Sequence, residues 1–146
     1  MSSNRGFTLI ELIVVILVIA LLAGLVAPMI MGNVTDAKVQ AARAQIELFG
    51  LALDAYRLDN DRYPETAQGL QALRATPESD PLPPRWRGPY LRKEVPVDPW
   101  GRAYLYTAPG VANPTSYDLY SLGRDGRLGG EGEDADLTSW GGPVPR

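Results

Sequence analysis

The sequence predicts an α+β fold in which a long N-terminal helix packs against a small antiparallel sheet. Three features indicate this fold: an uncharged apolar run at 12–32, a proline-free amphipathic stretch that follows it up to Tyr63, and two short tyrosine-rich segments near the C-terminus. The chain has 146 residues. The part after the apolar run is therefore long enough for one modest core.

A single helix is predicted from Thr8 to about Asn60, because no proline lies between Gly32 and Tyr63. Its first part is apolar on all sides. At 1.5 Å per residue the run 12–32 extends about 31 Å, which is close to the hydrocarbon thickness of a bilayer. A membrane-inserted segment is therefore preferred over a buried core helix or a cleaved secretory signal.

The residues that flank the apolar run indicate its orientation. Arg5 is the only basic residue before it and Lys38 is the first one after it. One positive charge is a weak signal, but it favours a cytoplasmic N-terminus. Gly24, Pro28 and Gly32 mark a weak place in the helix, which is either a functional hinge or the ordinary tolerance of membrane helices for these residues.

The second half of the helix carries one apolar stripe with alternating spacings of three and four residues. We interpret the stripe as core packing rather than as a cofactor site. Its members are Val39, Ala42, Ile46, Phe49, Leu53 and Tyr56.

Turn and strand signals fill the rest of the chain. Pro64 is expected to end any helix, and Thr66 is expected to cap a short one. Pro99 and Gly101 suit the second and fourth positions of a turn. Short strands are predicted at 103–107 and 116–121, and the segment APGVANPT connects them as a hairpin.

Two absent residue types narrow the function. The chain has no cysteine, which excludes disulfides and thiolate sites, and no histidine, which excludes imidazole-based catalysis. The net charge is −3 with no basic patch, so no nucleic-acid partner is expected. An enzyme would be left with carboxylates, lysine and tyrosine for its chemistry. The alternative of this class is a membrane-anchored periplasmic enzyme with paired carboxylates, for example a glycosidase, but nothing in the sequence fixes two carboxylates in a cleft.

Glu11 is the one charged residue in the apolar N-terminal segment. An ionised carboxylate at the centre of a bilayer costs roughly 2.5–3.5 kcal/mol, and less near the edge. Glu11 is either tolerated at the interface or paired with a cation. A cut between Gly6 and Phe7 would create an α-amine about one helical turn away, and the amine of a neighbouring subunit would then neutralise it.

The segment RGFTLIELIVV resembles the class III signal of type IV pilins and type II secretion pseudopilins. That signal is a leader ending in glycine, then an aromatic residue, Thr-Leu, and glutamate at the fifth mature position. The resemblance implies that a prepilin peptidase cleaves after Gly6 and that the Phe7 amine is N-methylated. It also implies that Glu11 recruits and registers the incoming subunit, and it matches Pro28 to the proline of the family's membrane helix, a further assembly residue.

Three further segments, RYPETAQGLQAL, GPYLRKEVPVDPWGRAYLY and YDLYSLGRDG, resemble the major pseudopilins of the type II secretion system, the general secretion pathway protein G family. This resemblance extends from Arg5 to Trp140. It implies a pilin-like fold with a leader at 1–6, a transmembrane and filament-core helix at 7–32, and a periplasmic domain at 33–146.

The function implied by this resemblance is structural. The chain would be a non-enzymatic subunit of a helical pseudopilus, a homo-oligomer that grows from the inner membrane and helps drive folded exoproteins across the outer membrane. Its implied partners are minor pseudopilins, the inner-membrane assembly platform and the prepilin peptidase. The alternative in the same superfamily is a type IV pilus subunit that serves adhesion or DNA uptake.

The second candidate site is the glycine-rich loop SLGRDGRLGGEGEDADLTSW, which has five carboxylates between Asp125 and Asp136. From the residues alone, a solvated loop and a Ca²⁺ site are both open. The major-pseudopilin resemblance implies Ca²⁺, held by the Leu122 carbonyl, Asp125, and Asp134, Asp136 or both. A metal would staple a loop that no disulfide closes.

Overall fold

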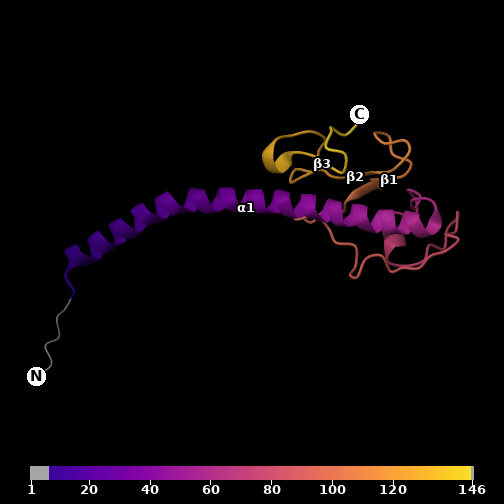
Figure 1. Ribbon diagram of the computed structural model, residues 1–146. Helices are drawn as coiled ribbons and strands as arrows, with labels where there is room; N and C mark the ends of the chain where they lie inside the picture. The colour runs from indigo at the N-terminus through magenta and orange to yellow at the C-terminus, as the bar shows by residue number, and fades with distance from the viewer. Residues whose placement is uncertain (1–6, 146) are drawn as a thin grey trace, which may run out of the picture. The chain divides into compact units, whose positions relative to one another are not determined.

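The computed structural model describes residues 7–145, and within 25–34 it describes the backbone alone. It confirms the predicted α+β class (Figure 1). Residue contacts divide the chain into two compact units, with the boundary between Asp36 and Ala37. The elements in chain order are α1 (Leu9–Asn60), η1 (Leu70–Leu73), β1 (Leu105–Thr107), β2 (Asp118–Ser121), η2 (Gly132–Asp134) and β3 (Leu137–Thr138).

Helix α1 has 52 residues and closely follows the predicted range. Thr8 caps its N-terminus, because its Oγ1 accepts a hydrogen bond from the Glu11 backbone N–H at 3.3 Å. The helix is continuous through the segment that contains Pro28. It ends at Asn60, four residues before Pro64, because Asp61 adopts a positive φ of 62° that breaks the helical repeat.

The sheet has three antiparallel strands in the order β1-β2-β3. Leu105 pairs with Tyr120 across β1 and β2, and Ser121 pairs with Leu137 across β2 and β3. The first two strands confirm the predicted hairpin with shorter bounds. Strand β3 was not predicted, because two residues are too few to show an alternating pattern.

The core lies in the second unit and is built on the predicted stripe of α1. Phe49, Leu53 and Tyr56 are fully buried, and Val39 packs at the edge of the cluster. The strands and the C-terminal loop lie on one side of this half of α1, and much of the segment between α1 and β1 lies on the other (Figure 1). The core residues from outside α1 are Leu70, Ala72, Leu73, Tyr104, Leu119 and Leu137.

Two expectations for the segment between α1 and β1 have different outcomes. The expected cap role of Thr66 is wrong, since η1 begins after Gly69 without a side-chain cap. Thr66 instead fastens this segment to the sheet: its Oγ1 donates to the Ala108 carbonyl at 3.1 Å and accepts from the Ala108 N–H at 2.9 Å. The predicted turn is confirmed, because the Gly101 N–H donates to the Asp98 carbonyl at 2.9 Å.

Candidate assembly surface and acidic loop

Phe7 and the N-terminal part of α1 present apolar side chains that no other part of the described chain, residues 7–145, covers. Phe7 is 80% exposed, Leu9 78% and Leu17 67%. Glu11 is exposed in the first helical turn, where the positive end of the helix dipole favours a carboxylate. Burial of this much apolar surface therefore requires another molecule or a lipid phase.

The remaining predicted residues of this region lie outside what the structure describes. Gly6 falls before the first described residue, and the side chain of Pro28 belongs to the stretch given as backbone alone. Over the described part of the chain, no helix has an apolar run long and continuous enough to meet the criterion for a membrane span.

The acidic loop follows β2 and depends on glycines where its two arms meet. Gly123 has a φ of 63°, and a Cβ there would lie 2.6 Å from the Glu133 carbonyl oxygen. Gly130 has a φ of 86°, and its Cβ would lie 2.4 Å from the Asp134 carbonyl oxygen. Only glycine fits both positions, because the backbone is left-handed and the opposite arm is in close approach.

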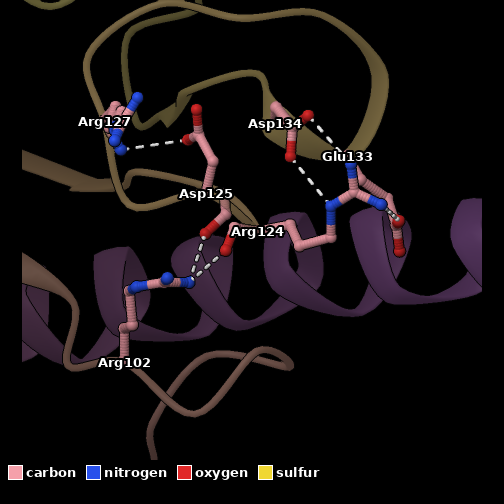
Figure 2. A network of polar contacts seen from close by, with 7 residues as sticks. Arg102, Arg124, Asp125, Arg127, Glu133 and Asp134 are labelled. Carbon is pink, nitrogen blue, oxygen red and sulfur yellow. Dashed lines mark hydrogen bonds and ion pairs between the residues drawn. The ribbon is translucent and has the colours of Figure 1, made fainter.

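The predicted carboxylates of this loop have different partners. Asp125 accepts the Arg127 backbone N–H at 3.0 Å, and in Figure 2 its carboxylate points away from Arg124. Asp134 is engaged by Arg124, whose Nε and Nη2 donate to the two carboxylate oxygens at 2.9 and 3.0 Å. Donation of these hydrogen bonds to the Asp134 carboxylate raises the pKa of the Arg124 guanidinium.

Asp136 combines a bonded and an unbonded carboxylate oxygen. Its Oδ2 accepts the Gly129 N–H at 2.8 Å and so joins the two arms of the loop. Its Oδ1 is buried without a hydrogen-bond partner. A buried carboxylate oxygen without a donor is costly unless a cation or a proton reaches it.

A buried network that sequence reasoning missed anchors the start of the loop. Asp98 is 3% exposed, and its Oδ2 accepts the Ser121 hydroxyl at 2.6 Å. The Ser121 oxygen in turn accepts the Gly123 N–H at 3.2 Å. Arg102, from the same turn as Asp98, donates to the Gly123 carbonyl at 3.1 Å and to that of Arg124 (Figure 2). In the sequence this network is marked only by the segment VDPWGR. The turn in that segment was predicted, but its contacts with Ser121 and Gly123 were not.

Asp125, Asp134 and Asp136 therefore lie on one short loop, but their carboxylates do not converge on a common point. Across residues 7–145, no group of three or more acidic side chains converges as it would around a bound ion. Arg124 and backbone N–H groups satisfy most of the carboxylate oxygens. The exception is Asp136 Oδ1, which is buried without a hydrogen-bond partner.

A long helix α1 whose second half packs on a small antiparallel sheet is the arrangement expected of a pilin-like protein. The N-terminus matches the family described as the prokaryotic N-terminal methylation motif over residues 1–27. Residues 29–140 match the family described as type II secretion system (T2SS), protein G. The chain belongs to the type II secretion system protein G family.

Curated relatives agree along nearly the whole chain. The type II secretion system core protein G of Pseudomonas aeruginosa is 48% identical over 137 residues, covering 94% of this chain and 95% of the relative. That of Vibrio cholerae is 43% identical over 141 residues, covering 96% and 94%. The crystal structure of the major pseudopilin from the type 2 secretion system of enterohaemorrhagic Escherichia coli matches with a TM-score of 0.63 and 39% identity, covering 75% of this chain and 92% of that one.

These matches decide between the alternatives that the sequence left open. The match to the type II secretion system protein G family extends over residues 29–140 and so includes the acidic loop. The secretion branch is therefore confirmed over a type IV pilus subunit. The family is one of structural pseudopilins, so the chain is not an enzyme and the glycosidase alternative is set aside.

Proposed function

We propose that the chain is the major structural subunit of a type II secretion pseudopilus. Copies of it assemble into a helical filament that grows from the inner membrane and helps drive folded exoproteins across the outer membrane. The observation that carries this proposal is the exposed apolar surface along the N-terminal segment and α1. Apolar side chains are exposed from Phe7 to Leu22, and beyond residue 36 a narrower row of apolar side chains on α1 is exposed as well.

The second half of α1 has an exposed apolar stripe on the side opposite the core. Its spacing alternates between four and three residues, as in helices that pack against other helices. Every member is exposed, with Leu48 at 54%, Leu51 at 68% and Leu58 at 84%. The stripe consists of Ala37, Ala41, Ala44, Leu48, Leu51, Ala55 and Leu58. Neighbouring copies in a filament would cover both apolar surfaces, and contacts of this head-to-tail kind continue without closing.

Processing prepares the N-terminus for assembly in this proposal. A prepilin peptidase removes residues 1–6 by cleaving after Gly6, and the new Phe7 amine is N-methylated. The match to the N-terminal methylation motif supports this step. The Glu11 carboxylate of an incoming copy pairs with a Phe7 amine already in the filament, because in a low-dielectric core each charge needs the other.

The proposed topology follows from the same segment. Residues 7–32 span the inner membrane once before assembly, with the N-terminus in the cytoplasm, and then form the filament core. Residues 33–146 form the periplasmic domain. The support is the uncharged run at 12–32. Pro28 in this run would let the helix bend or unwind as a copy leaves the membrane. Minor pseudopilins and the inner-membrane assembly platform are the proposed partners in assembly.

Calcium is proposed as the ion that completes the acidic loop. The Leu122 carbonyl, Asp125 and Asp136 would hold it, and the buried unpartnered Oδ1 of Asp136 supports this set. Asp134 is less suited, because both of its oxygens already accept from Arg124. Bound Ca²⁺ would supply a cation that neutralises these oxygens, and the chain would contribute rigidity through Asp98 and Arg102 at the start of the loop.

A charge placed in the exposed stripe tests the proposed assembly. Leu51→Glu changes a side chain that is 68% exposed, so the fold should be retained while a buried filament contact would acquire an unpaired charge. Cells carrying this variant with the other secretion components should release no sheared filaments, although circular dichroism shows a folded protein. Arg43→Glu places a carboxylate at an exposed position of α1 that lies off the stripe, and serves as the control. Normal filaments from Leu51→Glu would refute the role of the stripe.

A further inference from the structure

The side chain of Arg124 closes the acidic loop from inside the chain. Its Nε and Nη2 donate hydrogen bonds to the two carboxylate oxygens of Asp134, and its Nη1 donates to Glu133 Oε2 at 3.1 Å (Figure 2). Its backbone N–H donates to the Glu133 carbonyl at 2.8 Å. One residue therefore joins the first arm of the loop to η2 through both its backbone and its side chain.

The carboxylates that Arg124 contacts need a cation nearby. The Glu133 side chain is 14% exposed and that of Asp134 is 31% exposed, and the two residues are adjacent in sequence. Two partly buried like charges repel each other unless a positive group lies between them. The planar guanidinium provides a bidentate contact to one carboxylate and a single contact to the other, which an ammonium group does not reproduce.

Arg127 in the same loop provides the contrast. Its backbone N–H donates to Asp125, but among the described residues no carboxylate forms an ion pair with its side chain. The two arginines have equal charge and lie three residues apart. Of the two, only Arg124 pairs its guanidinium with carboxylates of the loop.

We propose that Arg124 is a built-in cation of the acidic loop, which neutralises Glu133 and Asp134 and makes closure of the loop less dependent on Ca²⁺. The loop then has two cationic supports. Arg124 acts on the side of η2, and the proposed metal acts at Asp125 and Asp136. Because the guanidinium repels a divalent ion in the same loop, it also weakens metal binding. The closing role of Arg124 rests on the ion pairs alone. The weakening of metal binding rests in addition on the proposed calcium site.

Melting of the full chain in detergent micelles, followed by tryptophan fluorescence, tests both parts. Arg124→Gln, Arg124→Lys and Arg127→Gln are compared with the parent in EGTA and in millimolar Ca²⁺. In EGTA, Arg124→Gln should melt about 2–5 °C below the parent, as expected for the loss of two partly exposed ion pairs. Arg124→Lys should lie between the two, and Arg127→Gln should stay within about 1 °C of the parent.

Calcium should restore much of the lost stability. The upward shift on adding Ca²⁺ should be larger in Arg124→Gln than in Arg127→Gln, and calorimetric titration should show Ca²⁺ bound at least about threefold more tightly. Equal melting of the two glutamine variants in EGTA would overturn the closing role. Equal Ca²⁺ shifts would overturn the competition. If Ca²⁺ changes none of the four proteins, the proposed metal site and the competition both fail, while a deficit confined to the Arg124 variants in EGTA still supports the closing role.

Discussion

Replacing Asp98 by alanine probes the network that holds the acidic loop to the core. The carboxylate is 3% exposed and accepts three hydrogen bonds, from the Trp100 N–H at 3.1 Å, the Arg102 N–H at 2.8 Å and the Ser121 hydroxyl at 2.6 Å. Alanine would leave all three donors without this acceptor. The donor on Ser121 is completely buried.

The expected loss follows from these contacts. A hydrogen bond to a charged group contributes about 1.5–3 kcal/mol, and a buried unsatisfied donor costs about 1–3 kcal/mol. Trp100 and Arg102 are partly exposed, so water can replace part of what they lose. We therefore expect Asp98→Ala to lower the free energy of unfolding by about 3–5 kcal/mol. Ser121→Ala removes the bond to Asp98 and the longer bond from the Gly123 N–H, and we expect it to lower the free energy of unfolding by about 1–3 kcal/mol.

Urea denaturation of residues 37–146, followed by tryptophan fluorescence, measures both values. Asp80→Ala removes a carboxylate from an exposed position and should change stability by less than about 0.5 kcal/mol. A loss below about 1.5 kcal/mol for Asp98→Ala would refute the reasoning. So would strict additivity of the Asp98 and Ser121 substitutions, because directly bonded side chains must show a coupling energy.

Three further predictions concern assembly, metal binding and pH. Glu11→Gln should leave cleavage before Phe7 intact by mass spectrometry but abolish sheared filaments; normal filaments would contradict the proposed ion pair. Asp125→Ala should lose the rise in melting temperature that Ca²⁺ gives the parent, and an undiminished rise would place the ion elsewhere. Burial raises the pKa values of Tyr104 and Tyr117 to about 12. Because folding favours the neutral phenol at both positions, the contribution of these tyrosines to the free energy of unfolding should be constant up to about pH 10 and should fall towards pH 12. Denaturation at a series of alkaline pH values, with tyrosinate absorbance as the titration signal, measures this loss. Stability that is unchanged at pH 11 would be inconsistent with these pKa values.

The helix was predictable because its signal is local and repeated. Apolar spacing predicted the buried stripe with Phe49 and Leu53, which the structure confirms. The roles that the N-terminal motif predicts for Phe7 and Glu11 stay predictions. The exposed stripe with Leu51 had an equally regular spacing. It was overlooked because an apolar residue on a helix is read as core until the structure shows which face is covered.

The acidic loop was predictable in composition but not in its contacts. From the glycines and carboxylates alone, a solvated loop and a Ca²⁺ site were both open. Nothing local in the sequence pairs Arg124 with Asp134, which lies ten residues away. The bond between Asp98 and Ser121 spans 23 residues and depends on how the turn meets β2. The cap predicted at Thr66 was wrong for the same reason, because the Thr66 hydroxyl bonds to the backbone of Ala108, which directly follows β1.

The central claim is that other copies of the chain cover the apolar surface of α1. Electron cryomicroscopy of filaments sheared from cells that express the chain with its secretion components tests it directly. The account predicts a helical assembly in which residues 7–24 pack in the core and Leu48, Leu51 and Leu58 contact neighbouring copies. A filament that leaves these side chains in solvent, or cells that export proteins while this chain stays monomeric in the membrane, would contradict it.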